Sequence, residues 1–214
     1  MTTRDITTQE LVERAAWHGA LSTLFARGDD ETFSRLQAAI AQLDPALAGP
    51  DGAHLLRRFI DVLRMSGPDG LRAERSRLFA GPAMCRTNET DYERLSFNMT
   101  QRLADVTGFF EAFGYEVADG AGERPDFAGT ELEFTRVLLL KQAYAMERGW
   151  PDEARLAEEA ASAFIRDHLL FWMPALCDKL IEAADDDGIF ASGARLMAAF
   201  LESEKGRVHE GEDE

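Results

Sequence analysis

The segment Arg124-Pro125-Asp126-Phe127-Ala128-Gly129-Thr130-Glu131-Leu132-Glu133-Phe134 joins a loop to the start of an apolar helix. Pro125 fixes its own φ and biases Arg124 toward an extended conformation. Asp126 or Thr130 can then cap a helix that begins near Glu131. Acidic side chains are favourable at this position, because each interacts with the positive end of the helix dipole by ~0.3–1 kcal/mol. Taken alone, these acids indicate helix initiation, and a functional role needs support from elsewhere in the chain.

Apolar residues recur at helical spacing over most of the chain, and no segment alternates with period two for long enough to predict a strand. We therefore expect an all-α fold of about nine helices in one domain over residues 1–204, followed by an acidic flexible tail over 205–214. Thr7 and Glu10 form a capping-box pattern at the start of the first helix. The expected helices cover about 8–27, 29–44, 52–65, 71–79, 95–113, 131–148, 151–173, a segment reaching 184, and 189–204.

Glycine and proline mark the expected breaks between these helices. The run Ser66-Gly67-Pro68-Asp69-Gly70 has the composition of a turn. Residues 115–130 show no period and suit a connecting loop. Pro174 is expected to kink or end a helix, because proline lacks the backbone N–H and steers Met173 away from α geometry.

The chain is strongly acidic, with 23 basic and 39 acidic side chains and a formal charge of −16. This charge repels nucleic acids and anionic lipids and favours a basic partner. There is no CxxC motif, no signal peptide and no apolar run long enough to cross a bilayer. We therefore expect a cytoplasmic protein without stable membrane insertion, in which Cys177 is a core residue and Cys85 lies in a loop where it could be exposed.

Motifs for catalysis are missing from the sequence. There is no G-x-S-x-G, Walker A, G-x-G-x-x-G or H-E-x-x-H pattern, and none of the four histidines follows a glutamate at the spacing used by di-metal bundles. We expect no catalytic residues, no metal site and no cofactor, and thus a protein that is not an enzyme.

Two further blocks accompany the 124–134 segment. They are Arg77-Leu78-Phe79-Ala80-Gly81-Pro82 and His168-Leu169-Leu170-Phe171-Trp172-Met173-Pro174. In this order the three blocks resemble the cytoplasmic maturation chaperones of molybdenum enzymes, which include those for trimethylamine-oxide, dimethyl-sulfoxide and nitrate reductases. The resemblance runs from about Glu74 to Leu180. Phe127 stands where the family usually has a histidine, so no imidazole chemistry is expected there.

The segment from Cys85 to Gly114 looks most like the subgroup that serves dimethyl-sulfide, ethylbenzene, selenate and chlorate oxidoreductases. The resemblance implies a compact helical chaperone, monomeric or dimeric. Its partner would be the catalytic subunit of a molybdopterin-dependent oxidoreductase, bound as the apo form and through its twin-arginine leader. Such a chaperone assists cofactor insertion and delays export.

A twin-arginine leader carries paired arginines followed by an apolar stretch, so its receptor needs an apolar groove with carboxylates at one end. We expect the carboxylates of Asp126, Glu131 and Glu133 at that end. The aromatic side chains of Phe79, Tyr92, Phe127 and Trp172 would line the groove. The candidate peptide-binding residues are Arg77, Phe79, Gly81, Pro82, Tyr92, Pro125, Asp126, Phe127, Glu131, Glu133, His168, Trp172 and Pro174.

Other readings of the same residues stay open. His168 can simply satisfy a carbonyl near a helix end, and Trp172 can be a core residue. The alternative function is a helical assembly or scaffold protein that binds the catalytic subunit independently of its leader. A small nucleotide-using enzyme is a weaker third hypothesis, because the chain has no phosphate loop and a charge of −16.

Overall fold

A computed structural model gives the fold of this chain, and it describes residues 6–80, 84–93, 96–117 and 123–210. Gly81 and Pro82 lie outside these ranges. The α-helices are α1 (Thr8–Phe25), α2 (Asp30–Ile40), α3 (Gly52–Phe79), α4 (Ser96–Ala112), α5 (Ala128–Arg148), α6 (Pro151–Phe164), α7 (Leu170–Ala183) and α8 (Ile189–Glu210). Shorter turns are the 3-10 segments η1 (Pro45–Ala48) and η2 (Glu89–Tyr92) and the π-helical segment η3 (Ile165–Leu169).

The all-α prediction is confirmed. Across the described residues, β pairing is limited to an isolated antiparallel bridge between Asn88 and Phe127. The expected N-terminal cap is also present, since the Thr7 hydroxyl accepts a hydrogen bond of 3.1 Å from the Glu10 N–H. In the part of the chain that the structure describes, no helix is both long enough and apolar enough to cross a membrane.

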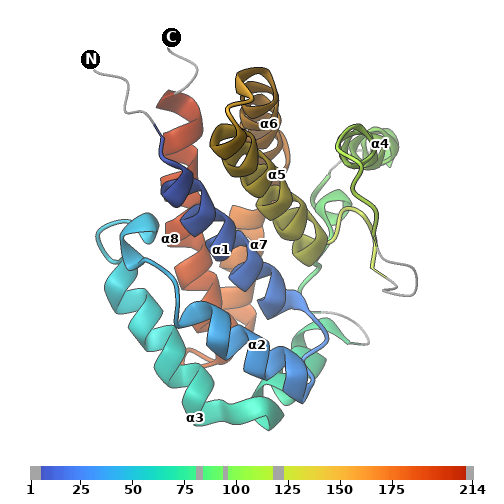
Figure 1. Cartoon of the computed structure of the whole chain (residues 1–214). Helices are drawn as coiled ribbons and strands as arrows, with labels where there is room; N and C mark the ends of the chain where they lie inside the picture. The colour runs from blue at the N-terminus through green and yellow to red at the C-terminus, as the bar shows by residue number, and fades with distance from the viewer. Residues whose placement is uncertain (1–5, 81–83, 94–95, 118–122, 211–214) are drawn as a thin grey trace.

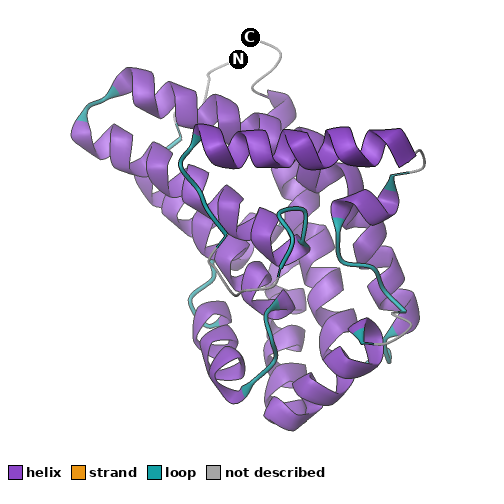
Figure 2. Ribbon diagram, turned by 90° about the vertical axis from the view of Figure 1, so that its right-hand side faces the viewer, coloured by secondary structure: helices purple, strands orange, loops and turns teal. Residues whose placement is uncertain are grey.

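The helices form a bundle in which α1 lies between α8 and the α5–α6 pair (Figure 1). Helices α2 and α3 close one end of this bundle. Helix α4 stands apart at its side, and the turned view shows it lying across the outer face of the other helices (Figure 2). Phe110 of α4 packs 4.6 Å from Phe134 of α5, and Phe109 packs 5.3 Å from Phe164 of α6, between ring centroids. These aromatic rings join α4 to the core.

The expectation of about nine helices is slightly off, for a reason visible at Gly67. The expected turn over residues 66–70 is a kink inside α3, where Gly67 adopts φ 64° and ψ −177°. Glycine alone adopts this conformation readily, so the two expected helices meet directly at a kink, without a loop between them, and together make up α3.

Three other boundaries differ from the sequence-based expectation. Helix α5 begins at Ala128, not near Glu131, and its N-cap is Phe127, so neither Asp126 nor Thr130 caps it. Helix α8 continues to Glu210, so residues 205–210 of the expected tail are helical. Pro174 lies inside α7, and the irregular turn is η3, which directly precedes that helix. Proline cannot donate to the carbonyl of Leu170 and crowds it, and a wider π turn just upstream accommodates such a defect.

Candidate functional site

The segment before η2 pairs with the segment before α5, and this pairing carries polar side chains into the bundle. Glu89 N–H donates to Asp126 O at 2.8 Å, and Ala128 N–H donates to Thr87 O at 2.9 Å. Because η2 is held against the start of α5 in this way, the side chains of Glu89 and Thr90 are buried. The sequence does not place them there, since a short 3-10 turn has no apolar period to show which side faces inward.

Asp126 is completely buried and its carboxylate is fully bonded. It accepts hydrogen bonds from the Thr90 hydroxyl at 2.7 Å and the Thr90 N–H at 3.2 Å. The Arg124 guanidinium forms a fork on the same carboxylate, with distances of 2.8 and 2.9 Å. Buried charges are stable when paired and bonded in this manner. Asp126 therefore fastens η2 to the start of α5, and the expectation that its carboxylate lies at an exposed groove mouth is wrong.

Glu131 is likewise sealed in the interior. One of its oxygens, Oε2, accepts a hydrogen bond of 2.9 Å from the indole N–H of Trp172. The other oxygen, Oε1, is buried and has no hydrogen-bond partner. Burial, followed by the negative charge of nearby Glu89, raises the pKa of Glu131 well above its ordinary range. The expected position of Glu131 at an exposed groove end is thus also wrong.

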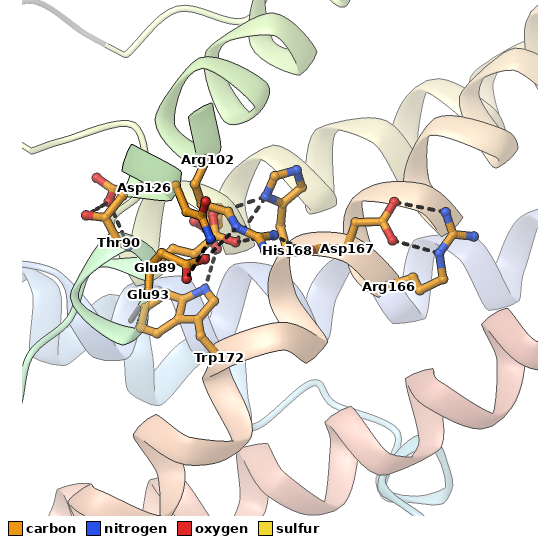
Figure 3. A network of polar contacts seen from close by, with 11 residues as sticks. Glu89, Thr90, Glu93, Arg102, Asp126, Arg166, Asp167, His168 and Trp172 are labelled. Atoms are coloured by element: carbon orange, nitrogen blue, oxygen red, sulfur yellow. Dashed lines mark hydrogen bonds and ion pairs between the residues drawn. The ribbon is translucent and has the colours of Figure 1, made fainter. Parts of the chain in front are cut away.

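Glu89 connects this region to His168 and to α4. The ring nitrogen Nδ1 of His168 lies 3.1 and 3.2 Å from the two Glu89 oxygens, and both side chains are buried. Arg102 of α4 approaches the same carboxylate at 3.4 Å and donates to the Asp167 carbonyl at 2.8 Å (Figure 3). We call Glu89, Thr90, Arg102, Asp126, Glu131, His168 and Trp172 the polar network.

The predicted convergence of separate segments is therefore present for part of the candidate set. Tyr92 lies beside the polar network, with its ring 5.2 Å from the Trp172 ring and its hydroxyl donating to Arg86 O at 3.0 Å. Trp172 is fully buried, in agreement with the core reading of this residue. His168 is buried as well, but it pairs with a carboxylate where the sequence suggested a backbone carbonyl.

Other candidates lie elsewhere. Phe79 packs against Phe190 at 4.9 Å and Phe25 at 6.4 Å, in a separate aromatic cluster. Arg77 donates to Ala183 O at 2.9 Å and so ties the end of α3 to the end of α7. Pro125 is partly buried beside Asp126. The four aromatic side chains expected to line one groove are thus divided between two clusters.

An open groove lies on the other side of the start of α5. It has a volume of about 370 Å³ and includes two of the predicted residues, Phe127 and Glu133. Glu133 is partly exposed and pairs with Arg136 at 2.6 Å. Burial and the nearby Glu133 raise the pKa of Tyr115 to about 12. The groove is lined by Ser22, Ala26, Arg27, Tyr115, Val117, Glu123, Phe127, Gly129, Thr130 and Glu133.

A second cavity of about 480 Å³ lies between α7 and α8 and contains the exposed Pro174. Its lining carries charges of both signs, from Arg166, Lys205, Asp178 and Glu202. Pro174 is therefore separated from the other candidates by the thickness of α7, because Trp172 and Met173 point into the core.

Several residues of the site were not among the sequence candidates. Glu89, Arg102 and Arg124 hold the polar network together, and the only sequence signal for Glu89 was its place just before Tyr92. Cys85, which the sequence suggested could be exposed, is buried, and its thiol points at Lys179 O at 3.6 Å. Burial raises the pKa of this thiol.

Comparison with known proteins adds independent findings. The family model "Nitrate reductase delta subunit" matches residues 29–178. The chain is similar to the chaperone protein TorD of Vibrio cholerae serotype O1, with 29% identity over 116 residues, which are 54% of this chain and 50% of that protein. It is also similar to the selenate reductase assembly chaperone protein of Thauera selenatis, with 30% identity over 108 residues, or 50% of this chain and 53% of the relative. The chain spans about half the length of the curated relatives it matches.

Proposed function

The chain belongs to the nitrate reductase delta subunit family, and from that premise we propose that it is a maturation chaperone for a molybdopterin-dependent oxidoreductase. In this proposal it binds the apo catalytic subunit and the twin-arginine leader of that subunit in the cytoplasm. It holds them while the cofactor is inserted and so delays export. The names of the two curated relatives support the chaperone role.

The observation that carries the leader-binding step is the groove beside Phe127. Its lining includes the apolar groups of Ala26, Val117 and Phe127 and the charged side chains of Arg27, Glu123 and Glu133. An apolar peptide with basic residues at one end matches the apolar groups and the two acids. Exposed ion pairs contribute only ~0.2–1 kcal/mol each, so the apolar groups supply most of the affinity and the charges set the peptide direction.

Asp126 and Glu131 take a different part in this proposal from the one the sequence suggested. Both are buried and bonded, so they hold the loop and the first turn of α5 that carry Phe127, Thr130 and Glu133. They shape the groove wall without touching the peptide.

Titration of a labelled leader peptide against the protein tests this proposal. We expect saturable binding at micromolar concentrations. Val117→Asp places a charge in the apolar groove and should weaken binding by at least about tenfold, whereas Glu133→Gln should weaken it by about two- to fivefold. The matched control is Glu153→Gln on the exposed face of α6, which should bind as the unchanged protein does. Absence of saturable binding would refute leader recognition, and unchanged binding by Val117→Asp would remove the groove from the site.

The second candidate is an assembly protein that binds the catalytic subunit independently of its leader. The burial of Asp126 and Glu131 favours it, because these two carboxylates do not reach a ligand from their present positions. Binding to the catalytic subunit with and without its leader separates the two functions. Equal affinity for both forms supports the assembly protein, and a loss on leader deletion supports the leader chaperone.

A further inference from the structure

Arg102 of α4 occupies a position at the edge of the polar network that has the features of a binding site for a guanidinium group. Its Nη1 donates to the Asp167 carbonyl at 2.8 Å and approaches Glu89 Oε1 at 3.4 Å. Its Nε lies 3.9 Å from a Glu93 oxygen. The guanidinium carbon is 4.0 Å from the centre of the Phe171 ring. A carbonyl, two carboxylates and an aromatic face thus surround one planar cation.

This combination favours arginine over lysine. The guanidinium is planar, carries donors in several directions and stacks on an aromatic ring, whereas an ammonium is a compact and strongly hydrated charge. Every partner of Arg102 named above comes from outside α4, namely from the η2 region, η3 and the first turn of α7. Apart from a bond of 3.2 Å that Asn98 of α4 donates to Glu93, the site is therefore built without the helix that fills it.

A pair of buried carboxyl groups lies next to this site. Glu89 and Glu131 are both completely buried and lie close enough for the Glu89 charge to raise the pKa of Glu131. Glu131 therefore holds its proton to higher pH than an ordinary carboxyl group, and its oxygens are not counted among the acceptors of the guanidinium site.

Arg102 can leave the site without unfolding α4. The helix is anchored separately by Val106 and Phe110, which are buried and lie on the next two turns. The Arg102 side chain itself is 24% exposed, and Phe171 is an exposed aromatic side chain. Rotation of the Arg102 side chain into solvent would therefore open the site from outside.

We propose that Arg102 is an internal substitute for an arginine of the ligand, which displaces it and binds to Glu89, Glu93, the Asp167 carbonyl and the Phe171 ring. This inference rests on the proposed function and assigns the arginines of the bound peptide to a site separate from the apolar groove. Arg102 competes with the ligand, so the site is closed until an arginine-containing segment arrives. The observed association constant is then the intrinsic one multiplied by the fraction of time that Arg102 leaves the site open.

The test compares the peptide acetyl-Gly-Arg-Arg-Gly-amide with its Lys-Lys counterpart on the unchanged protein, Arg102→Gln and Arg102→Lys. We expect Arg102→Gln to bind the Arg-Arg peptide about three- to tenfold more tightly. Arg102→Lys keeps the charge but loses the planar fork, so it should also bind more tightly than the unchanged protein. The Lys-Lys peptide should gain less than twofold in either variant. Arg155→Gln, which removes an exposed arginine from α6, is the charge-matched control and should change nothing.

Each other outcome contradicts the proposal in a defined way. An equal gain for both peptides in Arg102→Gln, with none in Arg102→Lys, would mean that only net charge matters. An unchanged or weaker Arg-Arg affinity in both variants, with unfolding curves like those of the unchanged protein, would overturn the substitution by Arg102 while leaving leader binding in the groove intact. If an Arg102 variant is destabilised, Phe171→Leu is used in its place, because it removes the aromatic face of the site. Unchanged binding of the Arg-Arg peptide by Phe171→Leu would equally overturn the proposal.

Discussion

The contact between Trp172 and Glu131 shows how much one buried hydrogen-bond donor can contribute to the stability of the fold. Both side chains are completely buried, and the indole N–H is the hydrogen-bond partner of Glu131 Oε2 at 2.9 Å. Trp172→Phe would leave Glu131 Oε2 without its hydrogen-bond donor. We expect the free energy of unfolding to fall by about 2–4 kcal/mol, from the unsatisfied group and the lost packing. Urea denaturation measures this change.

The matched control is Trp150→Phe, because Trp150 is 46% exposed. This variant should change the free energy of unfolding by no more than about 0.5 kcal/mol. Equal losses in the two variants would show that the indole N–H of Trp172 has no special role.

The raised pKa of Glu131 makes stability depend on pH in a known direction. Below the ordinary pKa of 4.5 the carboxyl is protonated in both the folded and the unfolded chain. As pH rises above 4.5, the unfolded chain releases this proton first, so the folded state loses stability until the pH passes the raised pKa. Glu131→Gln lacks this loss. The free energy of unfolding of Glu131→Gln minus that of the unchanged protein should therefore increase from pH 5 to pH 8.

Urea midpoints measured across this pH range test the expectation. The matched control is Glu133→Gln, two residues along the same helix, which removes only a partly exposed ion pair and should cost no more than about 1 kcal/mol at pH 7. A flat difference for Glu131→Gln would mean that Glu131 is ionised in the folded protein at pH 5.

Two glycines in different helices allow a test at the level of the element. An added Cβ would meet nothing within 4 Å at either Gly67 of α3 or Gly108 of α4, so only the backbone distinguishes them. Gly67 has φ 64° and ψ −177°, and Gly67→Ala should cost about 1–3 kcal/mol. Gly108 is helical and exposed, and Gly108→Ala should stabilise by about 0.5–1 kcal/mol. Thermal unfolding should shift in opposite directions, and a shift of the same sign would contradict the proposed kink.

Elements with a clear apolar period were predictable from the sequence. Helix α1 begins at Thr8 after a capping box, and α5 ends at Arg148 before a left-handed Gly149, as the pattern indicates. Elements without a period were not predictable. The sequence shows a turn at 66–70 but not that α3 continues through it, and it shows Pro174 but not that η3 precedes it. Such details depend on tertiary packing.

At the level of the whole molecule, the sequence indicated only in part which blocks come together. Tyr92 packs against Trp172 and its neighbour Thr90 bonds to Asp126, whereas Phe79 of the first block lies in a separate aromatic cluster. The burial of Asp126 and Trp172 depends on α4 and η2, whose contacts join residues far apart in the chain. Acidic side chains are rarely buried unless they are paired, so the sequence suggested exposed carboxylates. The partners of Asp126, Arg124 and Thr90, carry no periodic signal that would have revealed the pairing.

A buried and paired carboxylate also connects the two ends of the described chain, where α1 and the last turns of α8 lie side by side (Figure 1). Glu204 of α8 is completely buried, and Arg14 of α1 forms a fork on it with both distances at 2.9 Å. His18 lies 3.3 Å from the same carboxylate, and Arg207 adds a bond of 2.9 Å. Burial alone would raise the pKa of Glu204, but Arg14 and His18 together lower it well below its usual range.

Glu204→Gln should therefore destabilise the whole fold, because it leaves the buried Arg14 without a counter-charge. Removing one partner of a buried ion pair costs about 3–5 kcal/mol in the free energy of unfolding. The lowered pKa means that this stabilisation is present above pH 4.5 and is lost as the pH falls below that value. The difference in the free energy of unfolding between the unchanged protein and Glu204→Gln should accordingly be largest near neutral pH and shrink in acid.

Glu202→Gln, on the same helix but 76% exposed, is the matched control and should cost no more than about 0.5 kcal/mol. Equal stability of the two variants at pH 7 would show that the contact between α1 and α8 depends on apolar packing alone.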